Sequence, residues 1–212
     1  MSTLLLLGST GLVGQQLLAL ALADPAVRQV VAPTRRPLPA QERLLNPQVD
    51  FDQLPADAPW WRADAVLCAL GTTLRLAGSP EAFRRVDHDY VLAACRLARG
   101  AGTPRCGFVS SLGADAHSRG LYLRVKGETE RDLQALGFES LACIRPSLLD
   151  GGPRPDKRTG EALALALSRG LMPLLPRRWR PVSTARVAQA LYDAVREGRP
   201  GLHLIPSEAL QP

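Results

Sequence analysis

The order of apolar and polar positions along the chain predicts buried strands that alternate with amphipathic helices. Residues 4–7 are consecutive leucines that run into a glycine-rich turn, which is typical of a strand covered on both faces. Further apolar runs predict strands at residues 27–32, 65–70, 107–111 and 141–145, with shorter ones at 49–52 and 202–205 and a loop at 37–47. Helical spacing predicts helices at residues 12–21, 80–99, 121–136 and 184–196. We therefore expect an α/β fold with a doubly wound, mainly parallel sheet and helices on both faces.

The chain of 212 residues is long enough for one domain that buries roughly 70% of its unfolded surface. We expect a single domain over residues 1–212. Residues 146–181 are broken into short pieces by the prolines Pro146, Pro153, Pro155, Pro173, Pro176 and Pro181. This segment is therefore predicted to form a small cap on the substrate side, where Met172, Leu174 and Leu175 indicate an apolar pocket.

Composition argues against a secreted or membrane-spanning protein. Apolar residues make up 46% of the chain and charged residues 22%. No apolar run approaches the roughly 18 residues of a membrane span, so we expect a soluble globular protein with no membrane partner. The first residues lack the basic start and small-residue cleavage site of a secretory signal. We therefore expect a cytoplasmic protein.

The cysteines and histidines indicate neither a disulfide framework nor a metal site. Cys68, Cys95, Cys106 and Cys143 have no C-x-x-C spacing, and each lies among apolar residues. Buried free thiols are the interpretation that this pattern favours. The three histidines are scattered along the chain. We predict no bound metal.

The formal net charge of +6 raises the hypothesis of nucleic-acid binding. Only Lys126 and Lys157 are lysines, and the other basic residues are arginines spread over the whole chain. The aromatic residues that RNA-binding surfaces place beside basic ones are missing. The one dense basic stretch, residues 177–180, is explained more simply as a solvated loop. We expect no nucleic-acid partner.

The turn after the first strand is the first candidate binding site. It consists of Gly8, Ser9, Thr10, Gly11, Leu12, Val13 and Gly14. A strand that enters a helix through such a turn exposes backbone N–H groups at the helix N-terminus, where they favour a pyrophosphate. A purely structural turn is the alternative, because the Gly-x-x-Gly-x-x-Gly spacing differs from the commoner dinucleotide fingerprint.

Arg35 and Arg36 follow the second predicted strand, where the adenosine ribose lies in nucleotide-binding folds. Arginine pairs with a 2′-phosphate, whereas a carboxylate at this place would bind the 2′-hydroxyl. The pair therefore favours NADP(H) over NAD(H). Asp50 and Phe51 are candidates for contacts with the adenine amino group and ring, and a plain turn at these residues is the alternative.

Tyr122 and Lys126 are four residues apart in a predicted helix and therefore share one face. A phenol, with a reference pKa of about 10, exchanges protons poorly at neutral pH unless a nearby cation stabilises its phenolate. Lys126 can supply that charge and can also hold a ribose hydroxyl. The Ser111 hydroxyl, at the end of a predicted strand, can bind a substrate oxygen. The alternative is that Tyr122 packs in the structure and Lys126 is solvated.

These motifs together resemble the atypical short-chain dehydrogenase/reductase family, in its small NAD(P)H-binding branch that resembles the Tat-interacting protein. The resemblance rests on stretches along the whole chain, at residues 8–14, 50–51, 70–73, 86–90, 110–115, 122–128 and 144–147. It implies a Rossmann-like sheet with a nicotinamide cofactor across the strand ends and a triad of Ser111, Tyr122 and Lys126. The further cofactor-binding residues on the matching motifs are Leu70, Gly71, Thr72, Ser110 and Pro146.

The chain departs from the family pattern in one helix. Many members carry an asparagine there that organises a proton relay, and residues 83–99 contain none. Asp87, His88 or Asp89 would replace it only in part, which puts turnover in more doubt than cofactor binding.

Two functions follow as hypotheses. The first is an NADP(H)-dependent oxidoreductase that transfers hydride between the cofactor and a small, largely apolar carbonyl or alcohol substrate. The second is a regulatory protein that senses bound NADP(H), acts on a protein partner and turns nothing over. The sequence sets neither the substrate's identity nor the oligomeric state.

Overall fold

The computed structural model describes residues 2–150 and 176–211. A seven-stranded sheet runs through the middle of the molecule in the order β3-β2-β1-β4-β5-β6-β9, and every neighbouring pair in it is parallel. Its strands are β1 Thr3–Leu7, β2 Gln29–Val31, β3 Leu44–Leu45, β4 Ala65–Cys68, β5 Arg105–Val109, β6 Ser140–Arg145 and β9 Gly201–Pro206. The predicted Rossmann-like α/β fold is confirmed. From β1 the strands β2 and β3 follow toward one edge of the sheet, and from the neighbouring β4 the strands β5, β6 and β9 follow toward the other.

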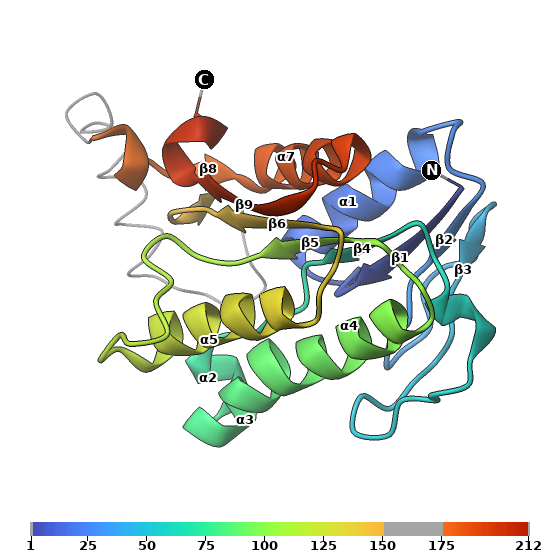
Figure 1. Ribbon diagram of the computed structural model, residues 1–212, viewed down its shortest axis with the longest axis horizontal. Coiled ribbons are helices and arrows are strands. Elements are labelled where there is room, and N and C mark those ends of the chain that lie inside the picture. Colours follow the sequence, from blue (N-terminus) through green and yellow to red (C-terminus); the bar gives the residue numbers. More distant parts are fainter. Residues whose placement is uncertain (1, 151–175, 212) are drawn as a thin grey trace.

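Helices cover both faces of the sheet, with α1 and α7 on one side and α4 and α5 on the other (Figure 1). The longer helices are α1 Leu12–Ala23, α4 Tyr90–Gly100, α5 Leu121–Ala135 and α7 Thr184–Glu197. The shorter ones are α2 Leu74–Ala77, α3 Pro80–Arg84, the π-helical turn η2 Arg85–Asp89 and the 3-10 turns η1 Pro59–Trp61, η4 Arg177–Trp179 and η5 Ser207–Leu210. The chain from α3 through η2 to α4 forms the predicted helix over residues 80–99.

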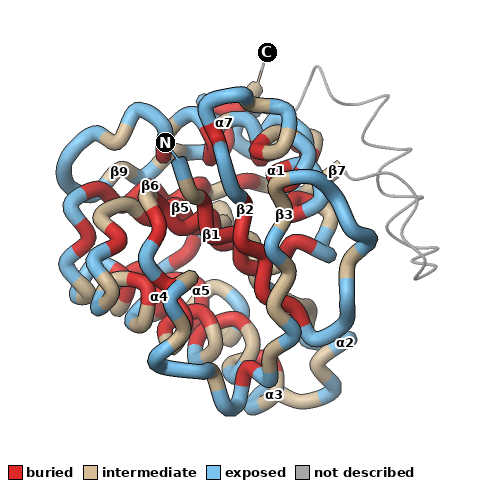
Figure 2. Tube along the Cα trace, turned by 90° about the vertical axis from the view of Figure 1, so that its right-hand side faces the viewer, coloured by how far each residue is buried: buried red, intermediate tan, exposed pale blue. Residues whose placement is uncertain are grey.

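The run of leucines in β1 shows why the central strands are apolar throughout. Leu4 and Leu6 pack into the core beneath α1 and α7, and Leu5 and Leu7 pack into the core beneath α4. All four are fully buried, and Figure 2 shows the central strands as the most buried part of the chain. A strand with a hydrophobic core on each face has no position left for a polar side chain.

The predicted starts of the helices at residues 80 and 184 are confirmed. Ser79 Oγ accepts the N–H of Ala82 at 3.1 Å, ahead of Pro80 at the first position of α3. Ser183 Oγ accepts the N–H of Arg186 at 3.3 Å at the start of α7. Each hydroxyl satisfies one N–H group that the helix itself leaves unpaired.

The predicted strand at residues 49–52 is wrong. The chain places β3 within the stretch expected to be a loop, and an isolated bridge joins Thr34 to Gln48. Asp50 lies in a turn, where its Oδ1 accepts the N–H of Asp52 at 2.9 Å. A strand of two residues is too short to leave a hydrophobic period, so the sequence pattern missed β3.

Most of the predicted cap lies outside the described residues, including Met172, Leu174 and Leu175. On either side of it, β7 Leu149–Asp150 and β8 Val182–Ser183 form a small parallel pair. Within residues 2–150 and 176–211, no helix has the length and apolar character needed to cross a bilayer, and no cluster of metal-binding side chains is found. The four cysteines are buried free thiols, as predicted.

Candidate functional site

The candidate site lies where the parallel strands end. Strands that run in one direction have their carboxyl ends at one edge of the sheet, which is where ligands bind in open α/β folds. The turn 8–14 follows β1, Leu70, Gly71 and Thr72 follow β4, Ser110 and Ser111 follow β5, and Pro146 follows β6. The fold therefore gathers at one edge segments that lie far apart in the sequence.

The glycine turn after β1 is packed as tightly as backbone allows. Gly8 has a φ of +83°, and a Cβ on it would lie 2.6 Å from the backbone of Ala69. A Cβ on Gly14 would lie 2.0 Å from the carbonyl oxygen of Gly8. These two glycines are thus needed for packing, which is the structural role left open from the sequence. The helix α1 begins directly after Gly11, and no side chain caps its N-terminus.

Buried hydroxyls at this edge are without partners. Ser9 Oγ after β1 and Ser110 Oγ after β5 have no hydrogen-bond partner within the described residues, and both serines are buried. Buried polar atoms are nearly always hydrogen-bonded in native proteins. Together with the uncapped helix, whose first N–H groups and dipole favour an anion, they fit a phosphate-bearing ligand laid across the strand ends.

Lys126 and Asp87 form a buried ion pair at the centre of the site. Lys126 Nζ lies 2.9 Å from Asp87 Oδ1, and the two side chains are 6% and 1% exposed. The other carboxylate oxygen accepts the backbone N–H of Thr72 at 2.7 Å. A Cβ on Gly71 would lie 3.0 Å from Asp87 Oδ1 and 3.5 Å from Lys126 Nζ, so the loop after β4 passes directly against the pair.

The surroundings of Lys126 keep it charged. Burial by itself would lower the pKa of Lys126, but the negative charge of Asp87 and the neighbouring Tyr122 outweigh it, so the pKa lies above its ordinary value. Its Nζ also lies 3.4 Å from the carbonyl oxygen of Val109 and 5.0 Å from the centre of the Phe108 ring. Lys126 is therefore a buried cation, in contrast to the solvated lysine that was the alternative.

Tyr122 and Ser111 are held at the same edge by the packing of α5. A Cβ on Gly127 would lie 2.2 Å from the backbone nitrogen of Ala116, so α5 approaches the loop after β5 as closely as backbone allows. Tyr122 is 38% exposed, and the centre of its ring lies 5.7 Å from that of Phe83. Ser111 Oγ is half-buried and donates to the carbonyl of Leu112 at 3.3 Å.

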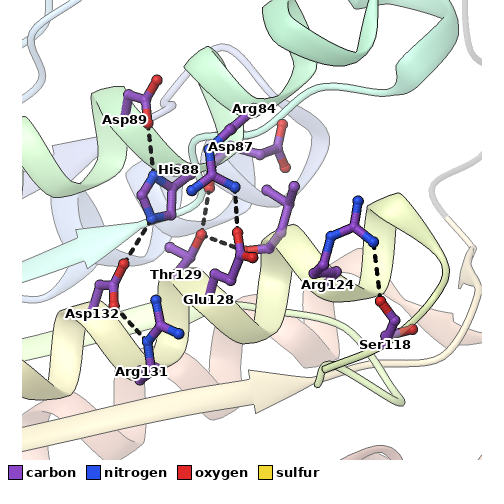
Figure 3. Close-up of polar contacts among 11 residues, drawn as sticks. Arg84, Asp87, His88, Asp89, Ser118, Arg124, Glu128, Thr129, Arg131 and Asp132 are labelled. Carbon is purple, nitrogen blue, oxygen red and sulfur yellow. Dashed lines mark hydrogen bonds and ion pairs between the residues drawn. The ribbon is translucent and has the colours of Figure 1, made fainter. Parts of the chain in front are cut away.

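Polar contacts join the turn η2 to α5 (Figure 3). Thr129 Oγ1 donates to the carbonyl oxygen of Asp87 at 3.1 Å. The His88 ring lies between Asp89 Oδ1 at 2.7 Å and Asp132 Oδ2 at 2.9 Å. A hydrogen bond from Arg131, and a further one from His88, lower the pKa of Asp132. The hydrogen bonds from Thr129 to Asp87 and between His88 and Asp132 fix the element that carries Asp87 against the helix that carries Lys126.

The remaining predicted binding residues lie around this centre. Arg35 and Arg36 are exposed and follow β2. Phe51 is buried, and its ring packs against Tyr90 with 5.6 Å between ring centres. Pro146 is buried, and its carbonyl oxygen accepts the N–H of Leu112 at 2.8 Å, which ties the end of β6 to the loop that follows Ser111.

Two residues matter more in the structure than the sequence indicated. Asp87 was one of three candidates for the missing asparagine, and only the fold shows that it is the residue that contacts Lys126. Gly127 was part of a matching motif, and the close approach that it permits depends on a loop distant in sequence. The sequence feature that pointed to Asp87 was its position on the predicted helix in which the expected asparagine is missing.

Relatives similar along most of this chain support the resemblance seen in the motifs. Protein HTATIP2 of Rattus norvegicus is 36% identical over 215 residues, which cover 97% of this chain and 86% of that protein. Protein FMP52, mitochondrial, of Candida albicans is 32% identical over 213 residues, which cover 93% of this chain and 89% of that protein. Protein fmp52, mitochondrial, of Emericella nidulans is 36% identical over 174 residues, which cover 77% of this chain and 73% of that protein. No protein-family model matches the chain.

Solved structures show the same fold at low identity. MoeE5 in complex with UDP-glucose and NAD superposes with a TM-score of 0.75 at 19% identity, over 96% of this chain and 75% of that one. A putative NAD-dependent epimerase/dehydratase from Bacillus halodurans superposes with a TM-score of 0.70 at 17% identity, over 99% of this chain and 97% of that one. Both similarities concern the fold.

The comparisons correct the expected location. The fungal relatives are named mitochondrial proteins, which overturns the prediction of a cytoplasmic protein. That prediction rested on the lack of a secretory signal, which argues against secretion but does not separate the cytosol from an organelle.

Proposed function

Because the chain belongs to the atypical short-chain dehydrogenase/reductase family, in the branch of HTATIP2 and FMP52, we propose that it is an NADP(H)-dependent oxidoreductase. Its substrate is a small, largely apolar carbonyl compound or the matching alcohol. The observation that carries this proposal is the buried cation of Lys126, one helical turn from Tyr122 and against the loop after β4. A charged lysine in that position has a chemical use, because it favours the ionised form of a nearby phenol.

The strand ends suit a nicotinamide dinucleotide. In this proposal the uncapped start of α1 and the turn 8–13 hold the pyrophosphate, and the Ser9 and Ser110 hydroxyls gain the partners that they lack. Asp50, Phe51, Leu70, Gly71, Thr72 and Pro146 line the rest of the cofactor site. The nicotinamide supplies or accepts the hydride when it is bound.

Arg35 and Arg36 carry the proposed preference for the phosphorylated cofactor. Both side chains are exposed just past the end of β2, where a 2′-phosphate on the adenosine ribose would lie. Charge-assisted hydrogen bonds from guanidinium groups to phosphate are among the strongest that a protein surface makes. The same two side chains offer nothing comparable to a ribose hydroxyl, so NAD(H) binds less tightly in this account.

The side chains of α5 and of the loop after β5 have separate tasks in the proposed reaction. Lys126 holds a ribose hydroxyl and keeps its charge near the Tyr122 phenol. Tyr122 gives its hydroxyl proton to the substrate oxygen in reduction and takes one back in oxidation. Ser111 donates a hydrogen bond to the same oxygen and stabilises its developing charge, after turning away from the Leu112 carbonyl.

One exposed apolar side chain at the edge of the sheet supports an apolar substrate. Leu148, which follows β6 at the same edge, is 44% exposed. We place the substrate against this residue and assign residues 146–181 to a cap within a single domain. An apolar surface discriminates between substrates mainly by the size of their apolar part and only weakly by their polar groups.

A turnover screen tests the proposal. NADPH oxidation is followed at 340 nm with purified protein and a panel of aldehydes, ketones and quinones, and the reverse direction is followed with alcohols and NADP⁺. Robust turnover of at least one apolar carbonyl compound is expected. Tight NADPH binding without turnover across the panel would instead favour the regulatory alternative, and lack of NADPH binding would contradict both.

A further inference from the structure

We propose that Asp87 is the positioning residue of this site: its one carboxylate fixes Lys126 and the backbone of Thr72 relative to each other, so that lysine and loop meet the cofactor as a single rigid surface. The binding of a cofactor to that surface rests on the proposed function, whereas the contacts of Asp87 with Lys126 and Thr72 do not. Asp87 acts through Lys126 and Thr72 and has no direct contact with substrate in this account.

The geometry gives each carboxylate oxygen its own partner. Oδ1 lies 2.9 Å from Lys126 Nζ, and Oδ2 accepts the N–H of Thr72 at 2.7 Å. An asparagine in the same place could accept the Thr72 N–H but would leave the lysine charge without a counter-ion. A carboxylate meets both needs directly, with one oxygen for each partner.

The residue is itself held rigidly. Asp87 lies in the π-helical turn η2, an irregularity of a kind that is frequent at functional sites. Its side chain is 1% exposed, and its carbonyl oxygen accepts the hydroxyl of Thr129 on α5. The carboxylate is thus connected to three elements: its own helix, the helix of Lys126, and the loop after β4.

The charge balance of Lys126 depends on few groups. The titratable groups with the largest influence on the pKa of Lys126 are Asp87 on η2, Tyr122 on α5 and Cys68 on β4. Asp87 is the one that forms an ion pair with it, and it is itself almost fully buried, so water screens the pair poorly. Removal of this charge leaves burial as the main influence on Lys126, and burial favours the neutral amine.

The composition of the chain allows a direct test. Lys126 and Lys157 are its two lysines, so protein labelled with ¹³C-lysine gives two Cε signals, and Lys126→Arg identifies them. We expect the Lys126 signal of the wild type to titrate above the ordinary range of a lysine side chain. Asp87→Asn should lower the Lys126 midpoint by about one pH unit or more. Asp89→Asn is the matched control, because Asp89 lies on the same turn and contacts His88 instead.

The Thr72 contact is tested with ¹⁵N-labelled protein and one further variant. Amide exchange of Thr72, followed by ¹⁵N NMR, should be slow in the wild type and in Asp89→Asn and at least about tenfold faster in Asp87→Ala, which removes the acceptor. Circular dichroism checks that each variant is folded. A wild-type Lys126 midpoint below the ordinary range of a lysine would overturn the proposal without any variant, and so would an unchanged Lys126 midpoint in folded Asp87→Asn.

The NMR experiments need neither cofactor nor substrate, so a negative turnover screen leaves them valid. A third readout connects the arrangement to the cofactor. NADPH affinity, measured by fluorescence titration, should weaken about tenfold in Asp87→Asn and stay unchanged in Asp89→Asn. Unchanged NADPH affinity in Asp87→Asn would overturn the positioning role, whereas failure of the wild type to bind NADPH would overturn the proposed function.

Discussion

The ammonium of Lys126 and the carboxylate of Asp87 lie 2.9 Å apart in surroundings that exclude nearly all water. The two residues are 39 positions apart in the sequence, on elements that pack together beside the strand ends. A charge buried in this way is costly when it is alone and tolerable when it is paired. The pair therefore links the stability of the fold to the chemistry of the site.

Lys126→Met should lower the free energy of unfolding by about 3–5 kcal/mol, because it leaves the Asp87 charge buried without a counter-ion. The double variant Lys126→Met/Asp87→Asn removes both charges and keeps an acceptor for the Thr72 N–H. It should be more stable than Lys126→Met alone. Urea denaturation at pH 7 measures all three proteins. A loss below about 1 kcal/mol in Lys126→Met would show that the pair is not buried as described.

Replacing both Arg35 and Arg36 with alanine should weaken NADPH binding by about 10-fold to 100-fold and leave NADH binding nearly unchanged. The reason is the loss of charge-assisted hydrogen bonds to the 2′-phosphate, which together are worth about 1.4–2.7 kcal/mol at this exposed position. Isothermal titration with the two cofactors measures the difference.

Arg28→Ala is the matched control, since Arg28 is an exposed arginine at the other end of β2. It should bind both cofactors like the wild type. An equal loss for NADPH and NADH in the Arg35/Arg36 variant would contradict the proposed role, because it would indicate an effect on the shared part of the two molecules.

Gly127→Ala should cost about 2 kcal/mol or more of stability, although alanine is the better helix former. Its Cβ would lie 2.2 Å from the backbone of Ala116, which cannot move without shifting the loop after β5. Gly100→Ala, at the end of α4, is the control, because a Cβ there meets nothing within 4 Å. Thermal denaturation should show Gly100→Ala near or above the wild type. A wild-type melting temperature for Gly127→Ala would mean that α5 packs less closely than described.

The sequence predicted the sheet well because the fold makes strong demands on it. A strand such as β1, with a core on each face, needs an unbroken apolar run, and the same holds for β4 and β6. The starts of the helices at residues 80 and 184 were equally clear, since the start of a helix is marked by local sequence features. The two-residue strand β3 was missed because it is too short to show a hydrophobic period, and its position is set by pairing with β2.

The site was predicted less completely than the fold. Spacing placed Tyr122 and Lys126 on one helix face, but it gave no indication that Lys126 is buried, since burial depends on what packs against α5. The choice of Asp87 over His88 and Asp89 depends on the register of a π-helical turn, which adds a residue to the helical period. The apolar residues assigned to the cap remain a prediction from the sequence.

Tyr122→Phe tests the central claim most directly, with turnover and NADPH affinity measured on the same preparation. The change removes one hydroxyl and keeps the ring that packs near Phe83. Our account predicts that kcat falls by about 100-fold or more, as for the loss of a general acid, while the Kd for NADPH stays within about twofold of the wild type. Wild-type turnover by Tyr122→Phe would contradict the account.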